Sequence, residues 1–198
     1  MSLFIAMFSF SLVMSISPGP VNMVIVSSGA SYGIRKTFSF VSGATVGFTS
    51  LLLFIGLGFD KALELYPSIL MYLSITGSIF IIYMGYSIIT SKPKLSIKES
   101  KQPTFVQGFL LQWLNPKAWV ACVAGVPLFS TPNESKLFLT FCIVYFFVCY
   151  FSLFSWAVLG NKTAMLLNND FKLQIFNRLM GVLLITTALF LLYVQFNI

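Results

Sequence analysis

The chain has 198 residues, of which 58% are hydrophobic and only 9% are charged, and its formal net charge is +7. Soluble domains carry about 25% charged residues, so this composition, with a mean hydropathy of +0.91, excludes an ordinary soluble domain and indicates a polytopic membrane protein.

Six stretches are apolar enough and long enough to cross a lipid bilayer, because a transmembrane helix needs roughly 20 mostly apolar residues. They cover residues 2–28, 38–59, 69–90, 105–130, 137–159 and 175–196. The polar segments between them leave too little chain for a soluble domain. We therefore expect an all-α membrane protein with six transmembrane helices that form one domain over residues 1–198. Because the first basic residue is Arg35, we expect the first stretch to be a retained span and not a secretory signal.

The first stretch is interrupted near its middle by Ser17, Pro18, Gly19 and Pro20, with Asn22 one turn further on. Proline ends a helical segment and is well suited to the first turn of the next one, and a preceding serine can cap that new helix. We therefore expect a broken helix whose new amino terminus lies inside the bilayer. Such an end carries about half a positive charge and binds anions such as carboxylates.

The second stretch carries a stripe of small residues, Ser39, Gly43 and Gly47, at intervals of four residues. Stripes of this kind allow two membrane helices to approach closely. We expect packing within one chain, and the alternative is a contact in a homodimer.

The fourth stretch is broken by Asn115, Pro116 and Lys117, again with a capping residue before a proline. Asn115 lies roughly 15 Å along the helix from its start at about 1.5 Å per residue, close to the middle of the bilayer. Gln112 and Trp113 precede this break and are further candidates to contact a polar solute. Trp113 offers a ring to a cationic amine, although packing is the more common use of such a ring.

Lys117 is the only charged residue that lies deep within a predicted span, and no acid lies in any span to pair with it. An unpaired ammonium near the centre of the bilayer costs at least a few kcal/mol. Two interpretations remain open: Lys117 binds backbone carbonyls freed by the break at residues 17–20, or it receives the carboxylate of a small substrate together with Asn115 and the two helix ends.

The chain divides into two halves of three spans each, residues 1–90 and 105–198, joined by a linker over residues 91–104. Because three is odd, a duplicated unit would be inverted relative to its copy, as in many transporter folds. Both halves begin with a proline-broken helix, which favours two inverted three-helix repeats.

The basic residues predict the orientation. The first, third and fifth connections hold nine of them, and the opposite side holds only Lys61 and Lys136. By the positive-inside rule this places those three connections in the cytoplasm and both termini outside. The net charge is thereby explained without a nucleic-acid partner.

Catalysis and metal binding are disfavoured by what the chain lacks. It has no histidine and only three cysteines, Cys122, Cys142 and Cys149, all within predicted spans and without Cys-x-x-Cys spacing. We therefore expect no metal, no cofactor and no enzymatic activity.

At these same positions the chain resembles the LysE-type translocators, a family of amino acid exporters that includes homoserine/threonine and cysteine/O-acetylserine exporters. The resemblance covers nearly the whole chain and rests on Ser17–Pro18–Gly19–Pro20, the run GASYGIRK at residues 29–36, Gly43, Gly47, Gly77, Tyr83–Gly85, and FVQGFLLQWLNPKAW at residues 105–119. One departure is Val21, which stands where many members have Asp or Asn.

The resemblance implies a bacterial inner-membrane exporter of small amino acids, driven by the proton gradient. Because no acid lies within a span to neutralise a cationic side chain, we expect a neutral substrate such as cysteine, O-acetylserine, homoserine or threonine. No buried carboxylate is available to carry a coupling proton, which leaves Lys117, an acid near a membrane face such as Asp60 or Glu64, or the charge of the substrate itself. The alternative function is a passive channel for small solutes or ions.

Overall fold

The computed structural model describes residues 2–59, 65, 68–90, 102–130, 135–167 and 170–196. Within these residues all regular structure is helical, which confirms the predicted all-α class. Three helical segments are long and apolar enough to cross a membrane, and three shorter apolar helices accompany them. The long ones are Pro20–Gly58, Lys136–Ala164 and Asp170–Tyr193, and the short ones are Leu3–Ile16, Ile75–Thr90 and Pro116–Phe129.

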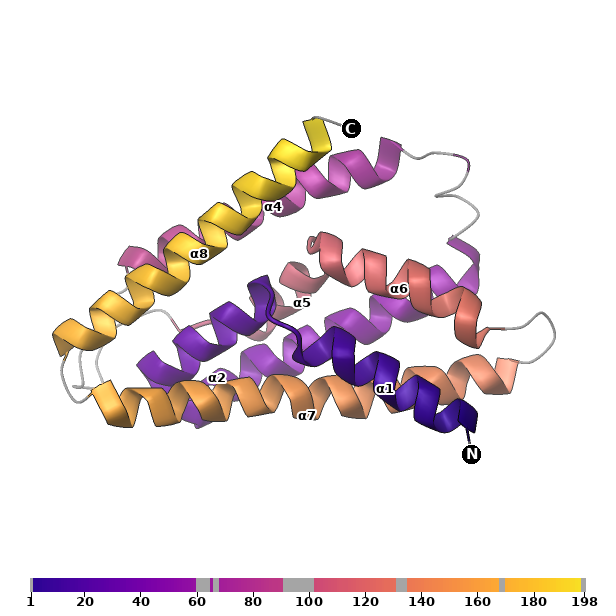
Figure 1. Ribbon diagram of the computed structural model, residues 1–198, viewed down its shortest axis with the longest axis horizontal. Coiled ribbons are helices and arrows are strands. Elements are labelled where there is room, and N and C mark those ends of the chain that lie inside the picture. Colours follow the sequence, from indigo (N-terminus) through magenta and orange to yellow (C-terminus); the bar gives the residue numbers. More distant parts are fainter. Residues whose placement is uncertain are drawn as a thin grey trace.

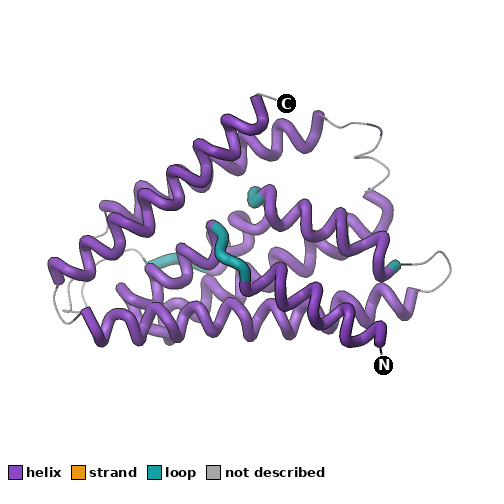
Figure 2. Tube along the Cα trace, viewed as in Figure 1, coloured by secondary structure: helices purple, strands orange, loops and turns teal. Residues whose placement is uncertain are grey.

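Figure 1 shows the arrangement of the helices. In chain order they are α1 (Ser2–Ile16), α2 (Pro20–Phe54), the π-helical turn η1 (Ile55–Phe59), α4 (Ser68–Thr90), α5 (Phe105–Trp113), α6 (Pro116–Phe129), α7 (Ser135–Leu167) and α8 (Asp170–Phe196). The chain is therefore broken at both predicted points, before Pro20 and before Pro116. Figure 2 shows both breaks as short loops midway along the molecule.

The helix α2 is two helices joined at Gly33. The backbone there has φ 78° and ψ 169°, outside the helical region, in a conformation that glycine adopts far more readily than other residues. Figure 1 shows the two halves of α2 meeting at one end of the molecule. The predicted polar connection after the first span thus coincides with this bend.

The predicted connection over residues 161–172 is wrong for most of its length. The helix α7 continues through Gly160, Asn161 and Lys162 to Leu167, and α8 already begins at Asp170. Polar residues such as Lys162 are compatible with a helix, because helix propensity does not follow hydropathy. The change from apolar to polar residues after Leu159 therefore does not mark the end of the helix.

Close helix crossings are made at glycines. A Cβ atom at Gly29 would overlap the carbonyl oxygen of Ala157 on α7, and one at Gly43 would overlap the carbonyl oxygen of Phe105 on α5. Gly47 likewise faces the backbone of Phe109. The small residues of α2 are thus used for packing within the chain, which was the preferred interpretation. Helix α1 also packs against α7, and α4 pairs with α8.

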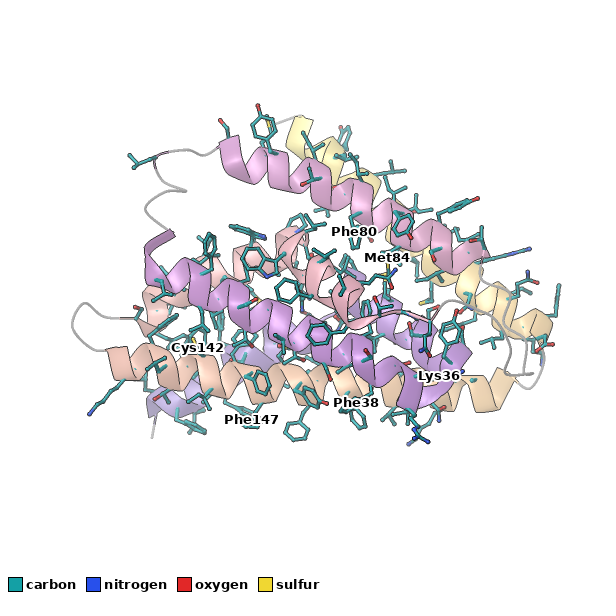
Figure 3. All side chains as sticks on the ribbon, turned by 180° about the vertical axis from the view of Figure 1, so that it is seen from behind. Lys36, Phe38, Phe80, Met84, Cys142 and Phe147 are labelled. Carbon is teal, nitrogen blue, oxygen red and sulfur yellow. The ribbon has the colours of Figure 1, made fainter. Side chains whose placement is uncertain are left out.

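The outer surface is apolar, as a lipid bilayer requires. Large hydrophobic side chains point outward all along the helices, among them Phe38 and Phe147 (Figure 3), which are 49% and 54% exposed. The interior holds a cluster of aromatic rings in which Phe10, Phe141 and Tyr145 are in mutual contact. This cluster lies between α1 and α7 and borders the region where the two breaks meet.

Candidate functional site

The first break frees the carbonyl oxygens at the end of α1, since the last four carbonyls of a helix have no partner within it. In this protein side chains bind each of them. The donors are Ser17 Oγ to Met14 at 3.3 Å, Asn22 Nδ2 to Ser15 at 3.1 Å, Trp156 Nε1 to Ile16 at 3.2 Å, and Lys117 Nζ to Ser17 at 2.7 Å. The carboxyl end of α1 is therefore held by α2, α6 and α7 together.

Lys117 connects the two breaks. Its Nζ atom lies 2.7 Å from the carbonyl oxygen of Ser17, 2.8 Å from the Ser17 hydroxyl and 3.4 Å from the carbonyl oxygen of Pro18. These three contacts match the three donors of an ammonium, and a cation is favoured at the negative end of a helix. The half-buried lysine thus binds freed backbone carbonyls, which is one of the two interpretations left open by the sequence. Its contact with a substrate carboxylate stays a hypothesis.

The two amino ends at the breaks differ in their capping. At the start of α6 the side-chain oxygen of Asn115 accepts the N–H of Lys117 at 3.1 Å, and the N–H of Ala118 bonds to the Asn115 carbonyl at 2.9 Å. Pro116 between them has no N–H, so this end offers no free donor.

The amino end of α2 is open instead. Gly19 at the capping position has no side chain to offer, and the first bond of the new helix runs from the N–H of Met23 to the Gly19 carbonyl at 3.0 Å. Within the described part of the chain, the N–H groups of Val21 and Asn22 therefore have no hydrogen-bond acceptor. The expectation that Ser17 caps the new helix is thus wrong, because the helix begins at Pro20 with Gly19 at the capping position and Ser17 Oγ donates to the Met14 carbonyl. The expected exposed amino end is present at α2 and absent at α6, because Asn115 can cap and glycine cannot.

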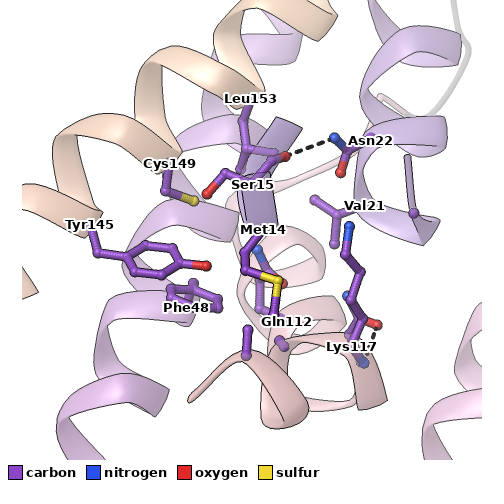
Figure 4. A pocket seen from close by; sticks show the side chains of 14 residues that line it. Met14, Ser15, Val21, Asn22, Phe48, Gln112, Lys117, Tyr145, Cys149 and Leu153 are labelled. Carbon is purple, nitrogen blue, oxygen red and sulfur yellow. Dashed lines mark hydrogen bonds between the residues drawn. The ribbon is translucent and has the colours of Figure 1, made fainter. Parts of the chain in front are cut away.

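A cavity of about 30 Å³ lies between the breaks, which is room for about one or two water molecules. Its lining comes from α1, α2, α5, α6 and α7 and consists of Met14, Ser15, Gly19, Val21, Asn22, Phe48, Gln112, Asn115, Lys117, Ala118, Ala121, Tyr145, Cys149 and Leu153 (Figure 4). The structure thereby brings together five of the residues singled out from the sequence: Gly19, Asn22, Gln112, Asn115 and Lys117.

The other candidates lie beside the cavity. Ser17 and Pro18 contact Lys117 through their oxygens, and Pro20 and Pro116 begin the helices without lining the space. Trp113 packs against α2: its indole N–H donates to Ser50 Oγ at 3.0 Å, and its ring lies against that of Phe54 with the centroids 5.4 Å apart. These contacts support the interpretation of Trp113 as a packing residue.

Gln112 differs from the other polar candidates in having no partner for its side chain among the described residues. Its backbone carbonyl accepts a hydrogen bond from the N–H of Asn115 at 3.2 Å. The residue is 5% exposed and its amide faces the cavity. An amide in this position has both donors and acceptors available for a bound solute.

Sequence reasoning missed the residues that α1 and α7 contribute, above all Ser15, Tyr145 and Cys149. Tyr145 and Cys149 are four residues apart and therefore lie on one face of α7. Their spacing was the available signal, but α7 is apolar on all sides, so nothing in its pattern indicated which face points inward. In the described residues no group of three or more Cys, Asp or Glu side chains could hold a metal ion.

Comparison with known proteins identifies a family model and several relatives that match this chain. The family model described as LysE type translocator matches residues 12–195. Cysteine/O-acetylserine efflux proteins of Escherichia coli (strain K12), Shigella flexneri serotype 5b (strain 8401) and Shigella sonnei (strain Ss046) are each 29% identical to this chain over 133 residues, which make up 67% of this chain and 68% of each relative. No solved structure matches the chain.

Proposed function

Because this chain belongs to the LysE type translocator family, we propose that it is a secondary active exporter of small neutral amino acids in a bacterial inner membrane. The relatives described above are named for the efflux of cysteine and O-acetylserine, which are both small and carry no net side-chain charge. The observation that carries the proposal within this chain is the cavity at which the two helix breaks meet.

The carboxylate of the substrate binds at the open amino end of α2. The free N–H groups of Val21 and Asn22 and the positive end of this helix favour an anion there. A Cβ atom at Gly19 would lie 3.4 Å from Lys117 Nζ, so the lysine ammonium is held against this end of the helix. Backbone donors and an ammonium on one side suit a carboxylate and leave the substrate amine to the amide oxygens of Asn22 and Gln112.

The lining favours a neutral and compact substrate. Lys117 is the only charged residue that borders the cavity, so a cationic side chain would find no anion to offset its loss of hydration. The space has room for only about one or two water molecules in this arrangement, so a substrate has to widen it, and a short side chain requires less widening than a long or aromatic one. Lysine and arginine are therefore expected to be poor substrates.

We propose that the chain makes six passes through the membrane. We assign them to α1 with the first half of α2, the second half of α2 with η1, α4, α5 with α6, α7, and α8. The helix pairing is what two inverted repeats would give: α1 packs on α7 as α5 packs on α2, and α4 pairs with α8. The linker over residues 91–101 lies outside the described residues.

Both termini are assigned to the periplasm. Among the described basic residues, those that follow the bend at Gly33 and those that flank the α7–α8 connection belong to the cytoplasmic side: Arg35, Lys36, Lys162, Lys172 and Arg178. Lys136 at the start of α7 belongs to the opposite side. The predicted assignments of Lys61, Lys92, Lys94, Lys98 and Lys101 lie outside the described residues.

Lys117 is the group that we assign to energy coupling. A substrate carboxylate at α2 competes with the Ser17 carbonyl for the ammonium, so substrate binding weakens the bond that joins α6 to the end of α1. Loss of a proton from Lys117 would weaken the same bond, because a neutral amine donates a weaker hydrogen bond than an ammonium. Substrate and proton thus act on one contact between the two half-helices, which is a means of linking their movements. The acids Asp60 and Glu64, the other candidates, lie outside the described residues.

Concentrative uptake into proteoliposomes tests this function. Vesicles with an acidic interior are given labelled cysteine under reducing conditions, O-acetylserine, homoserine, threonine or lysine. We expect at least one of the neutral amino acids to accumulate above its outside concentration, and a protonophore to abolish this accumulation. A passive channel would only equilibrate the label. Failure of all four neutral substrates to accumulate would contradict the proposal.

A further inference from the structure

We propose that the end of the cavity formed by Ser15, Tyr145 and Cys149 binds the side chain of the substrate and selects short side chains that end in a hydrogen-bonding group. This inference rests on the proposed export function and adds to it the residues that set specificity. Figure 4 shows these three residues at one side of the cavity, whereas Val21 and Lys117 lie at the other. We assign the first side to the side chain of a substrate molecule and the second side to its carboxylate.

Ser15 supplies the first observation. Its side chain is 7% exposed, and its Oγ atom has no hydrogen-bond partner among the described residues. A buried hydroxyl without a partner is costly, and buried polar groups are therefore nearly always paired. Ser15 lines the cavity, so a bound molecule can provide the missing partner. Only Ser78 on α4 shares this unpaired state in the described chain, and it does not line the cavity.

The second observation concerns Tyr145. It is 1% exposed, and its ring is stacked on Phe48 with the centroids 4.3 Å apart and the planes 21° apart. A second ring, that of Phe141, meets it edge-on at 5.6 Å. These contacts fix the ring so that its hydroxyl points into the cavity, on the side of the Ser15 side chain (Figure 4).

Cys149 and the apolar walls complete the pocket. Cys149 lies one turn after Tyr145 on α7 and is 2% exposed; its thiol is a weak donor and acceptor with a polarisable sulfur. Phe48 and Leu153 border the same space and limit the length of a side chain. A hydroxyl, a thiol or a small ester meets this environment well, because it can bond to Ser15 and Tyr145 without bringing a charge.

Isosteric pairs of amino acids separate this proposal from simple size selection. Threonine and valine have nearly the same shape, as do cysteine and 2-aminobutyrate, but only the first of each pair has the polar group. A site that provides hydrogen bonds to a substrate group discriminates against the analogue that lacks it. We expect the native protein to take up the polar member about fivefold faster or more at low concentration, since one such bond contributes about a factor of five.

The variants Ser15→Ala and Tyr145→Phe test the assignment, with Ser78→Ala as the matched control because it also removes an unpaired buried hydroxyl. The readout is the ratio of initial uptake rates within each isosteric pair, which does not depend on the amount of folded protein. We expect the ratio to fall to between about one and two in both cavity variants and to keep its native value in Ser78→Ala. An unchanged ratio in Ser15→Ala and Tyr145→Phe would overturn the proposal.

Labelling of Cys149 provides a second measurement that does not require transport. In protein carrying Cys122→Ala and Cys142→Ala, methyl methanethiosulfonate should label Cys149, and threonine should slow that labelling more strongly than glycine, which has no side chain to enter the pocket. If no label is incorporated, or if threonine gives no more protection than glycine while concentrative uptake persists, the side-chain pocket is refuted and export stands. If uptake is absent as well, the export function fails with it.

Discussion

The Nζ atom of Lys117 lies 2.7 Å from the carbonyl oxygen of Ser17, a residue 100 positions earlier in the chain. This contact joins the two helix breaks directly, because the charged residue of the second break caps the helix that ends at the first. It gives Lys117 a structural role beside the coupling role that we propose. A variant at Lys117 must therefore be judged on stability and on transport separately.

Lys117→Ala should lower both quantities. Without the ammonium, the carbonyls of Ser17 and Pro18 lose charge-assisted hydrogen bonds, which contribute about 1.5–3 kcal/mol each in favourable cases. We expect a lower unfolding temperature in detergent and the loss of concentrative uptake. Lys117→Arg should regain part of the stability, because the guanidinium also donates hydrogen bonds. Lys36→Ala, at an exposed position, is the control. Native stability in Lys117→Ala would show that the contact with Ser17 contributes nothing.

Gly29→Val should separate α2 from α7. A Cβ atom at this position would overlap the carbonyl oxygen of Ala157, and backbone atoms cannot move aside as a flexible side chain can. We expect a loss of roughly 1–3 kcal/mol or more, as for other overpacked positions, measured as a drop in unfolding temperature. Ala124→Val introduces the same side chain at an exposed position of α6 and should leave the temperature unchanged. Equal temperatures for the two variants would argue against the close crossing.

Orientation can be measured with introduced thiols. The three native cysteines are buried and are replaced by alanine, and single Lys36→Cys and Lys136→Cys variants are treated with a membrane-impermeant maleimide on intact cells. Under the positive-inside assignment, we expect Lys136→Cys to react at once and Lys36→Cys to react only after lysis. The opposite pattern would show that the topology is inverted, with both termini in the cytoplasm.

The positions of the helix breaks could be predicted because proline acts locally. Pro20 and Pro116 begin helices wherever the rest of the chain lies, and the residues before them decide the capping. The open end at Gly19 and the capped end at Asn115 also follow from these residue types, although the sequence interpretation treated the two ends alike. The bend at Gly33 was placed correctly because a polar segment with a glycine separates two apolar stretches.

The contacts across the cavity could not be predicted in the same way. Helix α7 has apolar residues on every side, so its sequence holds no periodic signal for the inward face. Tyr145 faces the cavity, whereas Tyr150 on the same helix packs against Phe38 with the ring centroids 6.0 Å apart; only the packing of α1 and α2 against α7 decides between them. The partner of Lys117 could not be predicted either, because no span contains an acid with which it would pair.

The most direct test of the central claim, that the cavity between the breaks binds the exported amino acid, is the Gln112→Leu variant. The Gln112 side chain has no hydrogen-bond partner in the described structure, so an apolar residue of similar size should leave the fold intact. Gln174→Leu on α8, outside the cavity, is the matched control.

The measurement is the initial rate of concentrative uptake of the preferred neutral amino acid, with the unfolding temperature recorded on the same samples. We expect Gln112→Leu to keep the native unfolding temperature or exceed it, and to lose about tenfold or more of the uptake rate, as the loss of about 1.4 kcal/mol or more of binding free energy implies. Gln174→Leu should match the native protein in both. A native uptake rate in well-folded Gln112→Leu would contradict the claim that the substrate passes through this cavity.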